Sequence, residues 1–296
     1  MTSRVLVVGG GNQIAAFLIP ALLADGLQVI VHSRRTPPRW IPSHPAMDWG
    51  TGPLQQVHHR AQEVDALVYL APLGEFSQLW RQLSPVARVV AFSSTSAVSK
   101  SNSQDDGERA LAAELTAGEK QLFSETQASG AALTVLRPTL IYGAGLDQNL
   151  TRLASFVRRW RVMPLLGAGC GNRQPVHAQD LADVARKLIV AANSIVGTYD
   201  LPGGSTLSYR LMVEKVFQSV NRTARFVSVP KAMARCALPL LRQTQRWRDL
   251  NLAMLDRMNQ HLVYDGSPAQ RDFDYNPRPF SPQSSTWLPL DQQKGL

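Results

Sequence analysis

The sequence predicts an α/β fold in which a parallel sheet carries helices on both of its faces. Residues 5–8 form a short apolar, β-branched run that leads directly into glycines 9–11, and a helical pattern of apolar residues follows. Strand, glycine turn and helix together open a βαβ unit. Short apolar stretches and helical stretches then alternate over roughly 200 residues, which is typical of a doubly wound, Rossmann-type sheet.

The remaining elements of this sheet follow in order along the chain. We expect strands at residues 28–32, 64–71, 88–93, 133–142 and 198–201, each short, apolar and bounded by turn residues. Pro138 predicts a bend or an edge position within the fourth of these. Helix formers predict a long helix over 105–129 that ends at Gly130, and an amphipathic helix over 180–192. The proline-rich stretch 37–53 predicts a loop with little regular structure.

The character of the chain changes after Pro202-Gly203-Gly204, where helical segments dominate and arginine becomes frequent. We therefore expect residues 1–145 and 177–202 to form the sheet domain. Residues 146–176 and 203–296 are expected to form a smaller, mostly helical lobe.

The composition is that of an ordinary globular protein of 296 residues, with 44% hydrophobic and 18% charged residues. No apolar run approaches the roughly 18–20 residues that span a bilayer. No signal-peptide pattern precedes the first strand, so we expect a cytoplasmic protein. Cys170 and Cys236 are too few for a metal cluster or a disulfide framework, and no metal site is predicted.

The formal net charge of +9 comes mostly from arginine, which favours planar, bidentate contacts to phosphate and carboxylate. This charge suits anionic small molecules such as dinucleotides and nucleotide sugars. It is spread along the chain and no nucleic-acid-binding module is present, so a nucleic-acid partner is not expected. A source organism whose proteins are generally rich in arginine would explain the excess of positive charge equally well.

The glycine turn after the first strand predicts a dinucleotide site. In such folds the backbone of this turn approaches a pyrophosphate at a helix N-terminus. The usual three-glycine spacing is met here by Gly9, Asn12 and Ala15. Asn is the residue next most able to adopt a left-handed conformation, and Ala is small enough for close helix–strand packing. The alternative is a tight turn without a ligand.

The end of the second strand favours NADP(H) over NAD. An NAD site usually places an acidic residue here for the ribose hydroxyls, whereas a 2′-phosphate calls for arginine. The chain has Ser33, Arg34 and Arg35 and no acid. The alternatives are a site for NAD, or a pair of solvated loop arginines.

With these features in place, the chain resembles the extended short-chain dehydrogenases/reductases, the family of NAD(P)-dependent sugar-nucleotide epimerases and dehydratases. The similarity is carried in order by residues 5–18, 65–71, 89–98, 133–143, 165–184, 197–204 and 265–280. The most specific of these stretches is LLGAGCGNRQPVHAQDLADV at 165–184.

The resemblance implies roles for particular residues. Thr95 falls where the family orients its substrate, Lys120 where a lysine binds the nicotinamide ribose, and Arg173 where an arginine contacts nucleotide-sugar phosphates. His177 and Asp180 are expected to fix a strand-to-helix turn. The expected cofactor contacts are Gly9, Gly11, Asn12, Gln13, Ile14, Ser33, Arg34, Arg35, Ala71, Lys120 and Pro138, and the expected substrate contacts are Thr95, Tyr142 and Arg173.

The chain departs from the family at the catalytic tyrosine. The family has this tyrosine four residues before the lysine, where both side chains share one face of a helix. Here that position is Thr116, whose alkyl hydroxyl is far more basic than a phenol and cannot be tuned toward neutrality. Ser99 likewise replaces the aromatic residue that the family has near the end of the preceding strand motif.

This departure leaves three interpretations. The first is an NADP-linked oxidoreductase or epimerase of a sugar nucleotide or similar polar substrate, with an acid/base such as Asp105, Asp106, Glu108 or Tyr142. The second is a non-catalytic NADP(H)-binding regulator or respiratory-complex accessory subunit. The third adds membrane-surface contact through the basic, apolar segments 156–166 and 229–247, for which a lobe helix with snorkelling arginines is the plainer interpretation. A homodimer stays open.

Overall fold

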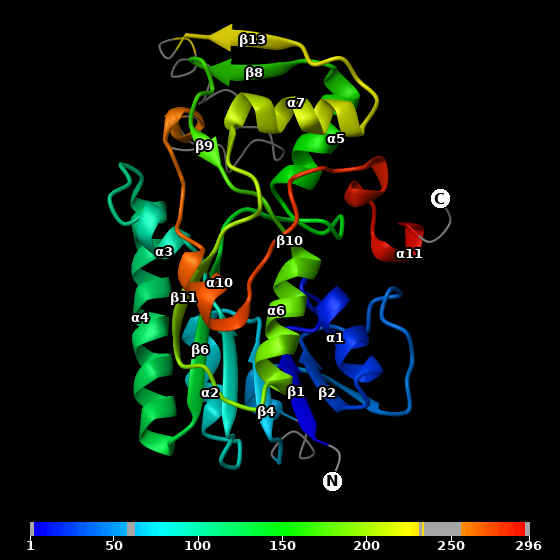
Figure 1. Ribbon diagram of the computed structural model, residues 1–296, viewed down its shortest axis with the longest axis vertical. Coiled ribbons are helices and arrows are strands. Elements are labelled where there is room, and N and C mark those ends of the chain that lie inside the picture. The colour runs from blue at the N-terminus through cyan, green and yellow to red at the C-terminus, as the bar shows by residue number, and fades with distance from the viewer. Residues whose placement is uncertain (1–2, 58–62, 231–232, 234–255, 294–296) are drawn as a thin grey trace.

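The computed structural model describes residues 3–57, 63–230, 233 and 256–293, and Figure 1 shows a sheet domain below a smaller lobe. The helices are α1 (Ala15–Ala24), α2 (Phe76–Trp80), α3 (Ser96–Ser99), α4 (Asp106–Ser129), α5 (Leu150–Trp160), α6 (Ala178–Val190), α7 (Tyr209–Ser219), α10 (Ser267–Phe273) and α11 (Leu290–Gln293). The strands are β1 (Arg4–Val8), β2 (Gln28–Ser33), β3 (Met47–Thr51), β4 (Ala66–Tyr69), β5 (Arg88–Phe92), β6 (Ala132–Pro138), β7 (Ile141–Tyr142), β8 (Met163–Leu166), β9 (Asn172–Arg173), β10 (Val176–His177), β11 (Gly197–Leu201), β12 (Leu207–Ser208) and β13 (Phe226–Val229). Within these ranges, no helix has the length and apolarity that a bilayer crossing requires.

Seven of the described strands form one sheet in the order β11-β6-β5-β4-β1-β2-β3, and every neighbouring pair is parallel. At its centre Val7 of β1 pairs with Val31 on one side and Val68 on the other. Strands buried on both faces need near-continuous apolar runs, which is the pattern these segments have. The predicted α/β, Rossmann-type sheet is confirmed.

The helices cover both faces of the sheet, with α1 and α6 on one face and α2 and α4 on the other (Figure 1). Leu18 and Leu181 belong to the first core cluster, and Phe76 and Leu122 belong to the second. Helix α4 ends where the sequence predicts, because Gly130 adopts the left-handed φ of 74° that closes the helix.

Two predictions about strands are refined by the structure. The expectation of a loop over 37–53 is wrong for β3, which pairs in parallel with β2 from Met47 to Thr51. Its residues are half-buried at the sheet edge, so they lack the apolar run that would reveal them. The predicted strand 133–142 divides at its proline: β6 ends at Pro138, and Ile141 and Tyr142 form the separate strand β7.

The lobe has its own core between α5, α7 and the β8–β13 pair. The segment 156–166, considered above as a membrane-surface helix, is not one helix. Helix α5 ends at Trp160, Arg161 turns the chain with a φ of 56°, and β8 then buries Met163 and Leu165. Most of the second candidate segment, 229–247, lies outside the described residues.

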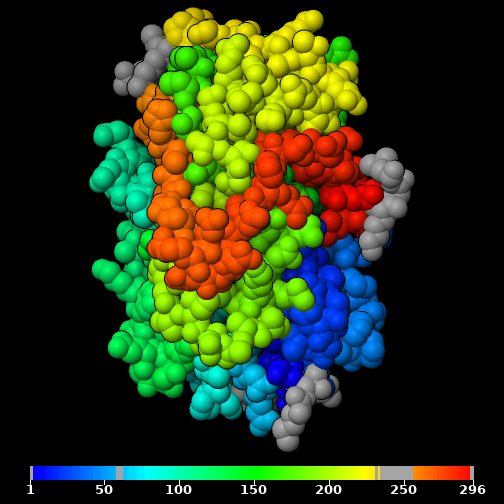
Figure 2. Space-filling model, in the orientation of Figure 1, coloured from blue at the N-terminus to red at the C-terminus, as the bar shows by residue number. Residues whose placement is uncertain are grey.

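The C-terminal segment joins the sheet domain to the lobe. Ala269 and Phe273 of α10 belong to the core of the sheet domain, and Figure 2 shows this orange segment lying over the green surface around α6. Further along, Phe280 and Trp287 belong to the core of the lobe. The C-terminal segment therefore contributes buried aromatic residues to the cores of both parts.

Candidate functional site

A cavity of about 1140 Å³ lies between the carboxyl edge of the sheet and the lobe. Open α/β sheets bind ligands outside the carboxyl ends of their strands, at the point where the strand order reverses. The lining from the sheet side includes Gln13, Ser94, Thr95, Ser96, Ser99, Lys100 and Thr139, and the lining from the lobe side includes Asp147, Arg173, Gln174, Tyr209, Arg257 and Tyr264.

The glycine turn presents bare backbone at the same edge. Gly9 has a φ of 91°, and a Cβ there would lie 3.0 Å from the carbonyl carbon of Leu70. A Cβ on Gly10 would lie 2.3 Å from Cγ1 of Val31, so this glycine is also required by packing. Gly11 is exposed, and the nearest atom to its added Cβ is the Ser33 hydroxyl at 3.8 Å. The turn is therefore closed on the sheet side and open toward solvent at Gly11.

Asn12 acts differently from the expectation. It does not adopt the left-handed conformation, which Gly9 takes instead. Its Oδ1 atom accepts a hydrogen bond of 2.8 Å from the amide of Ile14, at the start of α1. Next to it Gln13 reaches the cavity, and its buried Oε1 has no hydrogen-bond partner among the described residues. Such an orphaned acceptor points to a missing donor.

The end of β2 carries two unpaired arginines. Arg34 and Arg35 are exposed, and neither forms an ion pair with a residue that the structure describes. Ser33 is buried, and its hydroxyl accepts from the amide of Arg35 at 3.4 Å. The Trp49 indole nitrogen donates to the Arg35 carbonyl at 3.1 Å, which fixes this loop from β3. Sequence reasoning missed Trp49, because it assigned the segment to a loop.

Thr95 forms part of the cavity wall at the end of β5. It is 6% exposed, and its hydroxyl donates to the carbonyl of Pro138 at 3.2 Å. The hydroxyl of Tyr264, another cavity-lining residue, donates to the Thr95 carbonyl at 3.3 Å. Ala71 is half-buried just beyond β4. The structure thus brings Thr95 and Pro138 together and adds Tyr264, which lies too far along the chain for local sequence patterns to associate with them.

Helix α4 places neither Thr116 nor Lys120 in the cavity, and none of its residues lines the cavity. Lys120 is exposed, and the hydroxyl of Thr116 donates to the carbonyl of Ala112 on its own helix at 2.9 Å. The residue turned toward the sheet is Glu119, which is 5% exposed and accepts from the Arg137 guanidinium, with Nε to Oε1 at 2.8 Å. The position of Lys120, exposed and outside the cavity, therefore does not support the expectation that it binds a nicotinamide ribose.

The position of Thr116 makes a simple prediction. Because its hydroxyl is already engaged by its own helix, Thr116→Val should change dinucleotide affinity by less than about twofold and unfolding free energy by no more than about 0.5 kcal/mol. Calorimetry and urea titration measure the two quantities. A tenfold loss of affinity would show that this hydroxyl reaches the ligand.

The other proposed acid/base residues have structural partners. Tyr142 is 2% exposed, packs edge-on against the rings of His177 and Phe280, and does not line the cavity, so a substrate contact by it is not supported. Burial raises the pKa of Tyr142 to about 12. Asp105 caps α4 by accepting from the Glu108 amide at 3.0 Å. The remaining two carboxylates form ion pairs, Asp106 with Arg109 and Glu108 with Arg257.

Arg173 contributes a buried guanidinium to the cavity wall. It is 8% exposed, and its Nη1 atom donates to the carbonyls of Asn172 at 2.8 Å and Gln260 at 2.7 Å. It pairs with no described carboxylate, and its charge is offset only by carbonyl oxygens and by the face of the Tyr209 ring at 5.8 Å. Burial lowers the pKa of Arg173, which is the expected result for a cation held away from water without a counter-ion. A phosphate in the cavity would supply that counter-ion.

His177 and Asp180 fix the turn into α6, as the sequence predicts. The His177 Nδ1 atom accepts from the Gln179 amide at 3.1 Å and caps the helix. Asp180 accepts from the Arg278 amide at 3.0 Å and from its Nε atom at 2.7 Å. Burial, with Arg278 nearby, lowers the pKa of His177 to about 4. Both residues are therefore structural.

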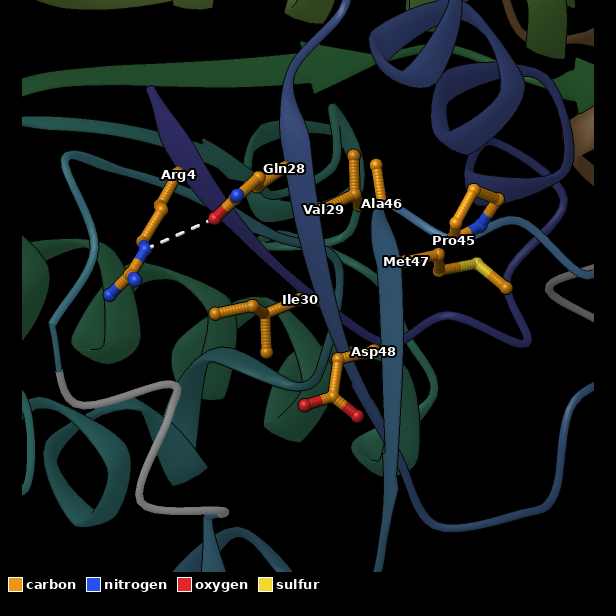
Figure 3. Close-up of a pocket in the computed structure, with 8 residues that line it drawn as sticks. All are labelled: Arg4, Gln28, Val29, Ile30, Pro45, Ala46, Met47 and Asp48. Atoms are coloured by element: carbon orange, nitrogen blue, oxygen red, sulfur yellow. Dashed lines mark hydrogen bonds between the residues drawn. The ribbon is translucent and has the colours of Figure 1, made fainter. Parts of the chain in front are cut away.

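A second hollow, of about 500 Å³, lies at the amino edge of the sheet, opposite the cavity. Figure 3 shows Arg4 and Gln28 joined across its rim by a hydrogen bond of 3.2 Å, with Ile30 and Met47 along its sides. Parallel sheets do not bind ligands at this edge as a rule. The described histidine, cysteine and carboxylate side chains form no group of three that could hold a metal ion.

No protein-family model matches the chain. An uncharacterized protein of Sinorhizobium fredii is 26% identical over 182 residues, which cover 59% of this chain and 42% of that protein. Mitochondrial NADH dehydrogenase [ubiquinone] 1 alpha subcomplex subunit 9 of Arabidopsis thaliana is 29% identical over 106 residues, which cover 34% of this chain and 26% of that protein. The chain thus spans less than half the length of these curated relatives.

Solved structures show the same fold over the whole chain. UDP-glucuronic acid 4-epimerase from Bacillus cereus, in complex with UDP-glucuronic acid and NAD, has a TM-score of 0.75 at 14% identity and covers 99% of each chain. An epimerase from Methanothermobacter thermautotrophicus has a TM-score of 0.72 at 16% identity, covering 96% of this chain and 90% of its own. The resemblance predicted from sequence is confirmed at the level of the fold.

Proposed function

We propose that this protein binds a nicotinamide dinucleotide at the glycine turn and a second, phosphate-bearing ligand in the adjoining cavity. The observation that carries the proposal is that bare backbone at Gly9–Gly11, the orphaned Gln13 acceptor and the buried guanidinium of Arg173 all converge on one edge of the sheet. The backbone amides of the glycine turn would hold the diphosphate of the cofactor, and Arg173 would hold that of the ligand. The Gln13 Oε1 atom would accept from a hydroxyl or amide donor of a bound ligand. The solved UDP-glucuronic acid 4-epimerase, in complex with UDP-glucuronic acid and NAD, supplies the precedent for this pairing.

We further propose that the protein works without the tyrosine–lysine proton relay of the family. A bound nicotinamide supplies hydride transfer, but a proton donor must then come from the chain. Helix α4 offers a carboxylate paired with Arg137 on its sheet-facing side, and no tyrosine or lysine in the cavity. This favours a binding or accessory role, and the short match to a respiratory-complex subunit agrees with it. Thr95, which lines the cavity, is the observation that favours the second candidate, an atypical oxidoreductase or epimerase.

Calorimetry and turnover assays on the full chain separate these outcomes. We expect NADPH to bind, UDP-glucose to bind in its presence, and no oxidation, reduction or epimerisation of the sugar to follow. Turnover would establish the second candidate function. If neither NADPH nor NADH bound the folded protein, the proposal would be wrong.

Arg34 and Arg35 are expected to select the 2′-phosphate. Replacing both by alanine should lower the ratio of NADPH to NADH affinity by about 10–100-fold, which is the range for charge-assisted hydrogen bonds of 1.5–3 kcal/mol. NADH affinity itself should change little. Arg4→Ala, at the opposite edge of the sheet, is the matched control and should leave the ratio unaltered. An unaltered ratio in the double variant would remove the argument for NADP.

A further inference from the structure

Four cationic side chains line the cavity: Lys100, Arg152, Arg173 and Arg257. Arg152, in α5, is exposed, and the other three are at least partly buried. Lys100 follows α3, Arg257 lies in the short 3-10 helix Arg257–Asn259, and Arg173 lies in β9. The charge of Arg257 repels both Lys100 and Arg173 and contributes to lowering the pKa of each. The cavity is therefore positive at two places, beside α3 and beside β9.

Arg257 is held in place by contacts of its side chain and of its backbone. Its guanidinium is 16% exposed and pairs with the buried carboxylate of Glu108, which also accepts from the Ser103 hydroxyl at 2.7 Å. Its backbone carbonyl accepts from Arg173. Most of the charge of Arg257 is thus neutralised within the protein by Glu108.

Lys100 keeps a positive charge without a direct partner. Its side chain is half-buried, and its ammonium group has no ion pair or hydrogen bond to a described residue. Burial, together with repulsion from Arg257, lowers the pKa of Lys100, while the charges of Glu108 and Asp105 act in the opposite direction. A partly desolvated ammonium of this kind is stabilised when an anion joins it.

The rest of the described lining does not supply that anion. Its one carboxylate is Asp147, and both oxygens of Asp147 are used to start α5. They accept from the amides of Asn149 and Thr151, each at 3.0 Å, and from the Thr151 hydroxyl at 2.5 Å. Among the described lining residues, none therefore offers Lys100 a carboxylate, and an anionic ligand would supply one.

We propose that the cavity ligand carries two acidic groups, a diphosphate at Arg173 and a carboxylate received by Lys100 next to Thr95. This rests on the proposed function and narrows its substrate class to nucleotide-linked sugars that bear a carboxylate. A single ammonium, beside an arginine that Glu108 already neutralises, suits a carboxylate of one negative charge better than a second phosphate. Ser96 and Ser99 on α3 add hydroxyl groups around the same point.

The experiment compares two probes that differ at one carbon, UDP-glucuronic acid and UDP-glucose, each titrated into the NADPH-saturated full chain. We expect UDP-glucuronic acid to bind about 10–100-fold more tightly, the range for a hydrogen bond between charged groups. Lys100→Met should abolish that preference and leave UDP-glucose affinity within about threefold. Lys120→Met, an exposed lysine outside the cavity, is the matched control and should keep the full preference.

The outcomes separate the inference from the proposed function. Equal binding of the two probes by the unmodified protein, or a preference that survives in both Lys100→Met and Lys100→Gln, overturns the role of Lys100 and leaves the proposed function standing. Failure of both probes to bind, with NADPH bound normally, overturns the second-ligand site itself. The comparison of the two probes on the unmodified protein tests the inference even if the Lys100 variants do not fold.

Discussion

Replacing Arg137 by methionine should destabilise the protein by about 3 kcal/mol, because a buried carboxylate then loses its partner. Glu119 has a side chain that is only 6% exposed, against 23% for Arg137, so the carboxylate bears most of the cost. Asp200 stands beside Arg137 in the sheet register, and its Oδ1 atom is buried without a hydrogen-bond partner among the described residues. Removing the guanidinium would leave the buried Glu119 carboxylate and the buried Oδ1 atom of Asp200 without this cation.

Urea unfolding at pH 7 measures this loss of stability, and two further variants serve as comparisons. Removing both partners with Glu119→Leu and Arg137→Met should cost less than the single arginine change, because no buried charge is left unpaired. Arg4→Met removes another strand arginine, whose ion pair with Glu63 is 48% and 80% exposed, and should cost no more than about 1 kcal/mol. Equal losses for Arg4→Met and Arg137→Met would contradict the structural role given to Glu119.

The fold was readable from the sequence wherever burial dictates the residue pattern. Strand β1, the turn at Gly9 and helix α1 follow one another as expected, since strands buried on both faces require unbroken apolar runs. Strand β3 was not predicted, because an edge strand is only half-buried and needs no such apolar run. Its position is set by pairing with β2, a long-range interaction that no local window of sequence contains.

The candidate site was less readable, because helix rotation and tertiary contacts decide it. Successive residues on an α-helix differ by 100° in direction, so Glu119 faces the sheet while Lys120 faces solvent. When a match to a family motif is displaced by one residue, the role therefore falls on a side chain that points away from the sheet instead of toward it. Arg257 and Tyr264 come to the cavity from a part of the chain with no recognised motif. Thr95 and Arg173 were located because their motifs sit at strand ends, where side-chain placement varies least.

The pKa of His177 should make the stability of the protein depend on pH between about 6.5 and 4. Burial and the Arg278 charge lower its pKa to about 4 in the folded state, against 6.5 for the free side chain. Below pH 6.5 the His177 imidazole is protonated in the unfolded chain but stays neutral in the folded protein. The free energy of unfolding therefore falls as the pH falls. The contribution is fully present above pH 6.5 and is lost on approaching pH 4, with a limit of about 3 kcal/mol for a shift of this size.

The variant His177→Asn isolates this contribution, since asparagine can still accept from the Gln179 amide as a helix cap but does not titrate. The neighbouring groups, Asp180, Arg278 and Tyr142, are the same in both proteins, so their own pH dependence cancels in the comparison. Between pH 7 and pH 4.5 the unfolding free energy of the unmodified protein should fall by about 2–3 kcal/mol more than that of the variant. Parallel curves would mean that the imidazole is accessible to water, and that the turn into α6 is looser than its hydrogen bonds indicate. The lobe segment that returns through this turn carries Arg173 three residues before β10, so a loose turn would also leave the proposed phosphate contact without a fixed position.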